Sequence, residues 1–492
     1  MSERCPEEAR LAEQQIFPQS LAGFRIHLVG IKGTGMAALA EILSARGARV
    51  SGSDTSETFY TDALLRKLSI PFAEGFAPEN LPPDTQLVVH SAAYRPEENP
   101  ELLEASARGI PMIEYPQALG ELSRLSDSSG VSGVHGKSTT TALCGVILKS
   151  WGMPATVLVG AEVPAFGARS TLIMGSRYFV AETCEYRRHF LNFHPARILI
   201  TSVEPDHLDY FKDQEDLLDA FAEYGALLPV RGQLVYCADE PGAASAALRI
   251  LSRRDDLVGV PYGRSAQGPF RIVDESAGEG CSGFALAGWQ QRFSLKVPGA
   301  HTVLNAAGAL ALCSLLWSRE HPRAPSLDLV SAAAAISDFN GSRRRSEVVG
   351  EAAGVLFLDD YAHHPTAITA TLQGFKRFYP KRRLIVDFMS HTYSRTRSLL
   401  HEFGQCFASA DLVVLHRIYA SARESNEGGM TGRDLFNEVS AHHGNVRYFE
   451  EPREAVPFLT SELQPGDLFV TMGAGDNWKL GRELLRSFGV RP

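Results

Sequence analysis

The feature that most constrains this 492-residue chain is the segment 133–141, which reads GVHGKSTTT. It follows a run of small residues over 128–132 and precedes an apolar helical pattern over 142–148. A strand, a glycine loop and a helix in that order form a phosphate cradle, because backbone N–H groups close on phosphate oxygens and the helix N-terminus adds partial positive charge. The segment therefore predicts a nucleotide site on an α/β domain.

Two side chains of this loop carry the expected chemistry. Lys137 would reach the terminal phosphates, and the hydroxyl of Ser138 is the usual Mg²⁺ ligand in such loops. The full Walker pattern requires a glycine five residues before Gly136, but Val131 stands there, so the glycine signature is shortened. The residues expected to contact the nucleotide are Gly133, His135, Gly136, Lys137, Ser138 and Thr139.

Length and composition predict a globular enzyme of several domains. A chain of 492 residues exceeds one hydrophobic core, and the usual domain size suggests about three domains. The net charge of -9 leaves no basic surplus to neutralise phosphates, which argues against a nucleic-acid partner. Seven cysteines are scattered without C-x-x-C spacing, so neither a disulfide framework nor a cysteine zinc site is indicated.

No targeting or membrane segment is expected. Residues 1–15 carry four glutamates and lack the apolar core of a signal peptide. No run of 18 apolar residues occurs, so we expect no membrane insertion. These features predict a cytoplasmic enzyme.

The N-terminal part reads as the opening of a doubly wound domain. A buried strand over 25–29 leads into a glycine-rich turn, and Gly33, Gly35 and Ala38 fit the G-x-G-x-x-[GA] pattern with Asp54 about 20 residues on. Gly30 allows a second interpretation, in which the turn begins one glycine earlier. A ligand that carries a pyrophosphate is supported, although a tight turn without a ligand would show the same glycines.

The central part carries further acidic residues at strand ends. A strand over 177–181 ends in Glu182, where a Mg²⁺-supporting carboxylate belongs. The segment 204–209 holds three carboxylates and His207, which indicates either a cation site or a solvated turn. Asn305 begins a helical run of small residues that would pack closely against a strand or a ligand.

The C-terminal part predicts a third α/β unit with a shared binding face. Its four apolar runs, over 355–358, 384–386, 412–415 and 468–470, each end in a polar or glycine-rich loop. Such loops gather at one edge of an open sheet. The loops are 359–366, 390–397, 418–423 and 473–476. The expected domains are a lead-in over 1–22 and three α/β domains over 23–122, 123–339 and 340–492.

Together these motifs resemble the Mur ligases, the ATP-dependent amide-forming enzymes of peptidoglycan synthesis. The resemblance runs from about Ile26 to Leu480. The matching segments are Gly33–Met36 (G-x-G-M), Gly133–Thr140 (G-T-H-G-K-[ST]-T-T except at Val134), Asp359–Thr366 (D-D-Y-x-H-H-P-T), His391–Thr396 (H-x-Y-S-R-T) and Gly473–Asp476 (G-A-G-D). The order and number of the motifs make the family resemblance strong.

The resemblance implies a role for each matching residue. It implies a Rossmann-like N-terminal UDP-binding domain, a central ATPase-type domain with a phosphate loop, and a Rossmann-like C-terminal domain for the amino acid. The implied UDP-sugar contacts are Gly33, Thr34, Gly35, Asp54 and Ser91. The implied metal ligands are Ser138, Glu182 and His207, and the implied ATP contacts beyond the loop are Asn305 and Arg345. The implied amino-acid site comprises Tyr361, His364, His391 and Arg395.

The resemblance is closest to the member that joins L-alanine to the lactyl carboxylate of UDP-N-acetylmuramate. That reaction would use ATP and Mg²⁺ and pass through an acyl phosphate, which the amine then attacks. Cations near the transferring phosphoryl group, such as Lys137 and Arg345, would dominate the acceleration. His207, His364 and His391 are the other candidate catalytic residues, and none is assigned as the general base. We expect a monomer or a weak homodimer.

Three departures from the family pattern stand out. Lys32 replaces a glycine and is expected either to contact the pyrophosphate or, more readily, to project outward. Val134 replaces a threonine in the phosphate loop. Thr392 replaces an arginine beside the incoming amino acid, which puts the amino-acid specificity in doubt.

Three alternative functions are open on the sequence alone. A recycling ligase that attaches a preformed tripeptide shares the segment 359–368, but the Y-S-R-T segment favours the alanine-adding member. A nicotinamide-dependent dehydrogenase would explain the N-terminal glycines, but it would leave Lys137 and Glu182 without a function. A non-catalytic nucleotide-binding regulator would have little reason to keep Lys137, Glu182, His207 and Arg345 together.

Overall fold

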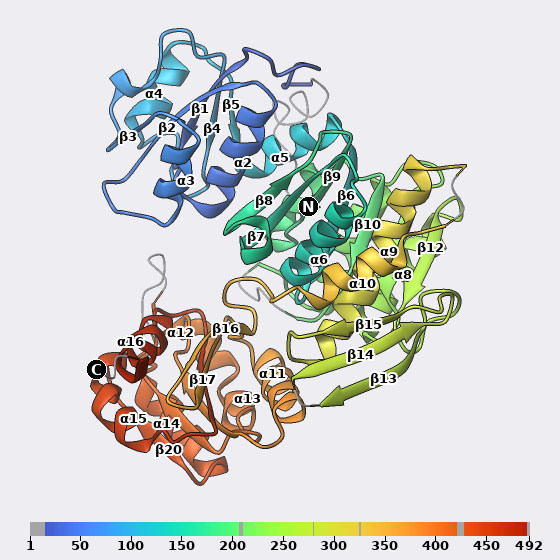
Figure 1. Ribbon diagram of the computed structural model, residues 1–492. Helices are drawn as coiled ribbons and strands as arrows, with labels where there is room; N and C mark the ends of the chain where they lie inside the picture. Colours follow the sequence, from blue (N-terminus) through green and yellow to red (C-terminus); the bar gives the residue numbers. More distant parts are fainter. Residues whose placement is uncertain (1–14, 206–209, 279, 324–325, 421–427, 490–492) are drawn as a thin grey trace. The chain divides into compact units, whose positions relative to one another are not determined.

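The computed structural model describes residues 15–205, 210–278, 280–323, 326–420 and 428–489 (Figure 1). The chain divides into two compact units. The first comprises Met1–Arg271 and Gly308–Asp328, and the second comprises Ile272–Ala307 and Leu329–Pro492. Each unit contains a mostly parallel sheet with helices on its faces, as the alternation of apolar strands and helical patterns predicts.

The first sheet is fully parallel and has the strand order β3-β2-β1-β4-β5. Its strands are β1 (Arg25–Val29), β2 (Arg49–Asp54), β3 (Phe72–Glu74), β4 (Leu87–His90) and β5 (Met112–Glu114). Its helices are α2 (Thr34–Ala45), α3 (Thr61–Lys67), α4 (Pro100–Ala107) and α5 (Tyr115–Arg124), with a 3₁₀ turn at Pro78–Asn80. The central position of β1 places the turn that follows it between the ends of β2 and β4.

The second sheet of this unit has the order β12-β11-β10-β6-β9-β7-β8, and only β8 runs antiparallel to its neighbour. Its strands are β6 (Asp127–Ser132), β7 (Ala155–Val163), β8 (Arg169–Ile173), β9 (Tyr178–Glu182), β10 (Arg197–Ile200), β11 (Gln233–Cys237) and β12 (Val258–Tyr262). Its helices are α6 (Lys137–Ser150), α7 (Gln214–Ala226) and α8 (Pro241–Arg253), with 3₁₀ segments at Pro164–Phe166 and Tyr186–Asn192. Because β6 pairs with both β9 and β10, the loops after these three strands meet at one edge.

A small antiparallel sheet begins the second unit. It has the order β13-β14-β15, formed by β13 (Ile272–Gly278), β14 (Cys281–Leu286) and β15 (Arg292–Leu295). Helix α9 (Ala300–Glu320) starts in this unit and ends in the first one, and α10 (Leu329–Ser337) packs against β15. The polypeptide therefore crosses between the two units within one continuous helix.

The C-terminal sheet has the order β16-β17-β21-β18-β19-β20, and only β16 is antiparallel. Its strands are β16 (Glu347–Ala352), β17 (Val355–Asp360), β18 (Arg383–Phe388), β19 (Leu412–Leu415), β20 (Val446–Tyr448) and β21 (Asp467–Met472). Its helices are α11 (Pro365–Phe378), α12 (Tyr393–Ser398), α13 (Leu400–Gln405), α14 (Gly432–His442), α15 (Val456–Glu462) and α16 (Trp478–Gly489), with a 3₁₀ turn at Pro452–Ala455. Apolar clusters on both faces of the sheet form its core.

The predicted α/β class is confirmed, and the predicted strands lie where the apolar runs placed them. β1 and β19 coincide with the expected ranges 25–29 and 412–415. Helix α2 begins at Thr34, directly after Gly33, which is its N-cap.

One helix in the described part of the chain is long and apolar enough to cross a membrane by composition. It is the segment His301–Glu320 of α9, and 72% of the apolar window is buried within the protein. A core helix passes the same test of length and composition, so this helix is weak evidence for a membrane span.

Candidate active site

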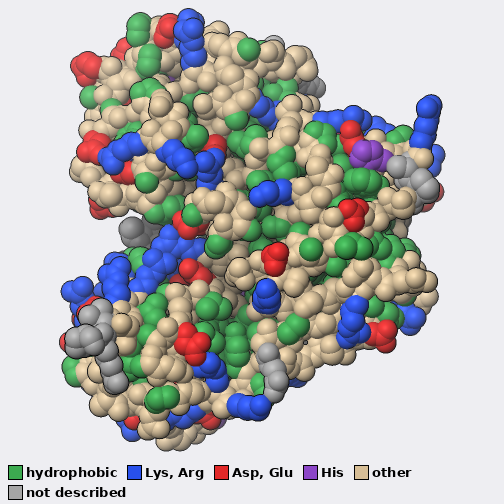
Figure 2. Space-filling view, in the orientation of Figure 1, with side chains coloured by type: hydrophobic (Ala, Val, Ile, Leu, Met, Phe, Trp, Pro, Cys, Tyr) green, Lys and Arg blue, Asp and Glu red, His purple; other side chains and the backbone are tan. Residues whose placement is uncertain are grey.

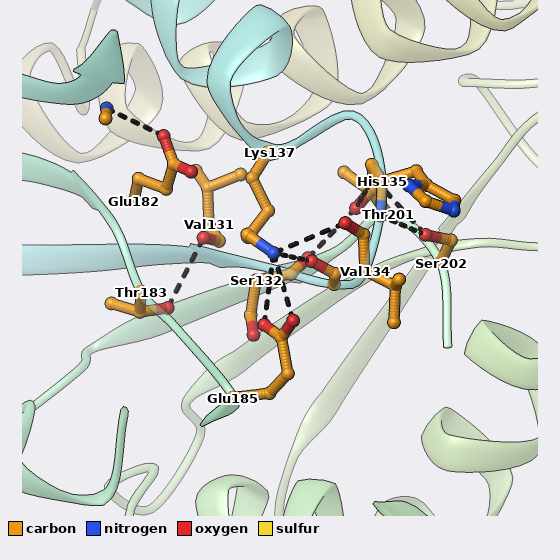
Figure 3. Close-up of polar contacts among 12 residues, drawn as sticks. Val131, Ser132, Val134, His135, Lys137, Glu182, Thr183, Glu185, Thr201 and Ser202 are labelled. Atoms are coloured by element: carbon orange, nitrogen blue, oxygen red, sulfur yellow. Dashed lines mark hydrogen bonds and ion pairs between the residues drawn. The ribbon is translucent and has the colours of Figure 1, made fainter. Parts of the chain in front are cut away.

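The phosphate loop between β6 and α6 has the backbone that its glycines predict (Figure 3). Gly136 is the N-cap of α6 with φ of 84°, and Gly133 has φ of 130°. A Cβ atom on Gly133 would lie 2.3 Å from Thr201 Oγ1 and 2.7 Å from the carbonyl oxygen of Ser202. The loop therefore requires glycine at 133 both for its φ and for its close approach to the end of β10.

Lys137 is the first residue of α6, and its ammonium group turns back onto the loop (Figure 3). It donates to the carbonyl oxygen of Gly133 and lies 3.1 Å from both carboxylate oxygens of Glu185. The side chains of Lys137 and Glu185 are only 13% and 2% exposed. Burial alone would lower the pKa of Lys137, but the nearby acidic groups, Glu185 foremost, raise it. The lysine is thus held fully charged at the helix N-terminus.

Ser138 and Glu182 form the oxygen pair that a magnesium ion would need. The Ser138 hydroxyl lies 3.1 and 2.9 Å from the two Glu182 carboxylate oxygens, and the backbone N–H of Gly160 donates to Glu182 Oε2 at 2.8 Å. β9 is the neighbour of β6, which places the carboxylate beside the helix start. A hydroxyl and a carboxylate are ligands that Mg²⁺ accepts, so the donor set fits this ion.

The loop after β10 braces the phosphate loop from the other side. The backbone N–H groups of Val134 and His135 donate to the carbonyl oxygen (3.0 Å) and the hydroxyl (2.8 Å) of Ser202. Thr201 Oγ1 donates to the His135 carbonyl at 2.6 Å, and His135 Nε2 lies 3.5 Å from Glu204 Oε1. His207, the expected second metal ligand, lies outside the described residues.

The glycine turn after β1 contains one glycine with positive φ, Gly30, and two glycines at the start of α2, Gly33 and Gly35. Gly30 has φ of 86°, and a Cβ atom there would lie 2.7 Å from the Tyr94 ring, whereas Gly33 is the N-cap of α2. A Cβ atom on Gly35 would lie 2.9 Å from the Tyr115 ring. The turn therefore begins at Gly30, as the second interpretation of the glycines predicted. Gly35 is packed against Tyr115, whereas a Cβ atom on Gly33 would meet, among the described residues, only the Gly30 carbonyl oxygen, at 3.5 Å.

Thr34, Asp54 and Ser91 lie around the same turn. Thr34 Oγ1 accepts from the Tyr60 hydroxyl at 2.7 Å. Asp54 ends β2, and its carboxylate accepts from the backbone N–H of Lys32 at 2.7 Å and from the Tyr94 hydroxyl at 3.1 Å. Ser91 directly follows β4, where its N–H donates to the Val29 carbonyl at 3.0 Å. The sheet order thus brings the expected UDP-sugar residues together.

The expectation that Lys32 projects outward is wrong. Its side chain is fully buried and its ammonium group donates to the carbonyl oxygens of Thr55 and Glu57, both at 2.9 Å. Asp62 and Glu74 each lie 3.5 Å from the same nitrogen. These partners offset the cost of burying the charge, so Lys32 is an internal brace of the segment that follows β2.

Asn305 carries an unsatisfied amide. The residue is 5% exposed, and its Nδ2 atom is buried without a hydrogen-bond partner among the described residues. A buried amide without a partner is costly, and such groups in folded proteins point to a missing ligand or water. The expected contact between Asn305 and the adenine would supply that partner.

Arg344 and Arg345, shortly before β16, lie close to the ring of Tyr361, which follows β17. The guanidinium carbons of Arg344 and Arg345 lie 5.1 and 5.3 Å from the centre of the Tyr361 ring. Arg344 also pairs with Asp359 at 3.0 Å and donates to the carbonyl of Gly473 at 2.6 Å. Burial raises the pKa of Asp359 to about 6, although Arg344 and the Thr471 hydroxyl oppose this shift. Arg344 is held inside the domain, and Arg345 is the arginine that resemblance assigns to the phosphate.

His364, His391 and Arg395 follow two parallel strands of the C-terminal sheet, β17 and β18, which both pair with β21 between them. His364 is the N-cap of α11 after β17, and His391 and Arg395 follow β18. The His391 ring stacks on Tyr419 with centroids 6.0 Å apart, and the N–H of Thr392 donates to the Tyr419 carbonyl at 3.1 Å. Because β17, β18, β19 and β21 are parallel, the described residues of the polar loops share one edge, as predicted, and residues 421–423 of the third loop lie outside the described part.

Positive charge gathers on the C-terminal part of the chain. Figure 2 shows a group of lysine and arginine side chains over the region of α12 and α16. In that region Arg343, Lys479 and Arg482 lie 5.6, 5.9 and 5.1 Å from the ring of Trp478. Two of these cations have acidic partners, because Lys479 lies 3.1 Å from Asp476 and Arg482 lies 3.6 Å from Glu347.

Sequence reasoning missed Glu185, Arg344 and the bracing role of Ser202. Glu185 stands three residues after Glu182 in the sequence ETCE, and that spacing of two carboxylates after one strand was an available signal. Arg344 and Ser202 offered none, because their contacts depend on how separate strands come together.

Three family models match the chain. They are the Mur ligase family catalytic domain over residues 25–126, the Mur ligase middle domain over 131–313, and the Mur ligase glutamate ligase domain over 344–475. Together they cover most of the chain and each falls on one of the large sheets.

Curated relatives and a solved structure match over nearly the full length. A UDP-N-acetylmuramate–L-alanine ligase from Treponema pallidum is 50% identical over 471 residues, which cover 96% of this chain and 98% of the relative. A ligase of the same name from Desulfitobacterium hafniense is 40% identical over 94% of this chain and 99% of its own length. The crystal structure of a UDP-N-acetylmuramate–alanine ligase from Thermotoga maritima has a TM-score of 0.74 at 25% identity and covers 94% of this chain and 99% of its own. The chain therefore belongs to the Mur ligase family.

Proposed function

We propose that this enzyme joins L-alanine to the lactyl carboxylate of UDP-N-acetylmuramate, with ATP as the second substrate, in the synthesis of peptidoglycan precursors. The observation that carries the proposal is the charged phosphate loop in which Lys137 and the Ser138–Glu182 pair flank the start of α6. Near-full-length relatives that bear the name of this activity support the choice of substrates.

The phosphate loop would perform the activating half of the reaction. Backbone N–H groups at the start of α6 would hold the ATP phosphates, with Asn305 at the adenine and Arg345 at the terminal phosphate. Bound Mg²⁺, held by Ser138, Glu182 and His207, would neutralise charge on the phosphates. The fixed ammonium of Lys137 would stabilise the negative charge that gathers as the carboxylate attacks phosphorus. One charge at about 4 Å is worth roughly 4 kcal/mol near a protein surface, which is about a thousandfold in rate.

The C-terminal domain would supply the amine. Tyr361, His364 and His391 follow β17 and β18, and Arg395 lies on α12, which also follows β18. Arg395 would pair with the carboxylate of alanine. The amine would attack the acyl phosphate, and the tetrahedral intermediate would expel phosphate. The acyl phosphate needs protection from water, so we infer that domain closure accompanies catalysis.

The N-terminal turn would bind the uridine diphosphate. Gly33, Thr34 and Gly35 open α2, whose N-terminus attracts the pyrophosphate, and Asp54 and Ser91 flank that turn. We propose domain boundaries of 23–122, 123–339 and 340–492 after the lead-in of residues 1–22. We further propose that the enzyme is cytoplasmic, because its nucleotide substrates are those of the cell interior. We also propose that it is a monomer or a weak homodimer.

The proposal is tested by phosphate release with ATP, Mg²⁺ and UDP-N-acetylmuramate. L-alanine, glycine, L-serine and the preformed tripeptide would be supplied separately. We expect the highest kcat/KM with L-alanine. Turnover with the tripeptide alone would overturn the proposal in favour of a recycling ligase, and NAD binding without ATP binding would favour a dehydrogenase.

A further inference from the structure

Two histidines and a glutamate converge on the surface of the C-terminal domain, on helices that the proposed reaction does not use. His401 lies on α13, and Glu438 and His442 lie one turn apart on α14. One ligand atom from each residue lies within 4.8 Å of the other two. Two imidazoles and a carboxylate are the ligand set of many three-ligand zinc sites.

The separations agree with coordination around one ion. His401 Nδ1 lies 3.3 Å from Glu438 Oε1, and His442 Nε2 lies 3.6 Å from the same oxygen. Ligands at about 2.0–2.1 Å from a tetrahedral zinc ion lie about 3.3–3.4 Å from one another. The side chain of His401 is 72% exposed, so its imidazole can rotate toward His442 without disturbing the core.

The scaffold under the three ligands is rigid. Buried Phe403 on α13 and buried Leu435 and Val439 on α14 belong to one apolar cluster. Gly404 lets the helices approach, because a Cβ atom there would lie 2.9 Å from His442 Cδ2 and 3.0 Å from Glu438 Cγ. The ligands are therefore presented from two helices whose spacing is fixed by packing.

Gln405 can support His401 as a metal ligand. The amide nitrogen of Gln405 lies 3.0 Å from Nε2 of His401. With a metal on Nδ1, the imidazole carries its proton on Nε2, and the Gln405 amide can turn its oxygen toward that N–H. A partner of this kind orients a ligating histidine.

We propose that His401, Glu438 and His442 form a surface site for Zn²⁺, with water as the fourth ligand, that clamps α13 to α14. Imidazole ligands select zinc and similar transition metals over Mg²⁺, so this site differs in chemistry from the Ser138–Glu182 pair. The site needs no cysteine, which is why cysteine spacing gave no sign of it.

The test is zinc titration of the full-length protein by calorimetry, in excess Mg²⁺ to fill the oxygen site and after alkylation of free thiols. The wild type, His401→Ala, His442→Ala and the control Glu402→Gln would be compared. Glu402 is an exposed acidic residue on α13, so its removal changes the surface charge without removing a ligand. Melting curves in chelator would establish that all four proteins are folded.

We expect one zinc equivalent in the wild type and the control, and its loss or at least about tenfold weaker binding in both histidine variants. Zinc should also raise the melting temperature of the wild type and the control only, because a ligand that binds the folded state stabilises it. Equal zinc stoichiometry and affinity in all four proteins would overturn the proposal.

Discussion

Lys137 has a structural role as well as its proposed catalytic one, and the two can be separated. Replacing Lys137 with alanine leaves the Glu185 carboxylate, 2% exposed, without its counter-charge. Removing one partner of a buried ion pair costs about 3–5 kcal/mol, and we take about 3 because Lys137 keeps some contact with water. A domain of 150–250 residues loses about 2–4 °C per kcal/mol, so the melting temperature should fall by about 6–12 °C.

The assay compares Lys137→Ala with the double variant Lys137→Ala/Glu185→Gln. Melting is followed by circular dichroism, and turnover by phosphate release. The double variant should recover most of the lost melting temperature, because the glutamine leaves no buried charge, and should still show no turnover. A single variant that melts like the wild type would refute the structural role, and turnover in the double variant would refute the catalytic one.

Three further predictions follow from single residues. Lys32→Ala should raise the KM for UDP-N-acetylmuramate about tenfold, the equivalent of about 1.4 kcal/mol, and leave the KM for L-alanine unchanged. The control Lys67→Ala, at an exposed lysine, should alter neither KM. If Lys32→Ala has the same KM values as the wild type, a bracing role for Lys32 is excluded. Burial alone would lower the pKa of His416, but Asp387, 2.7 Å away, outweighs burial, and the pKa lies above its usual 6.5. The pair of His416 and Asp387 therefore stabilises the fold fully below pH 6.5 and progressively less as the pH rises. The melting temperature lost in His416→Gln should therefore be larger at pH 6 than at pH 9, and a pH-independent difference would contradict this. Thr392 has φ of 68° and ψ of 136° despite its branched side chain, a sparsely populated backbone conformation that costs about 1–3 kcal/mol. Thr392→Gly should therefore melt no lower than the wild type, and a clear drop in melting temperature would show that the conformation is unstrained.

Much of the fold could be predicted because its strands are continuous apolar runs. Parallel strands buried on both faces show such runs, and β1 and β19 match the prediction residue for residue. The phosphate loop was predictable for a related reason, since glycines and a lysine at fixed spacing define a local backbone. Local patterns of this kind survive in any tertiary context.

Lys32, Glu185 and Thr392 show where sequence reasoning ends. Lys32 was expected at the surface because lysine usually is, yet carbonyl and carboxylate groups from the segment after β2 enclose it. Glu185 pairs with a lysine 48 positions earlier in the chain. The φ of Thr392 depends on a hydrogen bond to Tyr419, on a different strand's loop. Each outcome rests on tertiary contacts that no local pattern encodes.

The central claim is that ATP activates the lactyl carboxylate for attack by an amine. UDP-N-acetylmuramate labelled with ¹⁸O in that carboxylate would be incubated with the enzyme, ATP, Mg²⁺ and L-alanine. The released phosphate and the product would be measured by mass spectrometry. The acyl-phosphate route predicts one ¹⁸O atom in each phosphate and one alanyl residue added to the sugar nucleotide. Unlabelled phosphate, or phosphate release without the alanyl product, would contradict it.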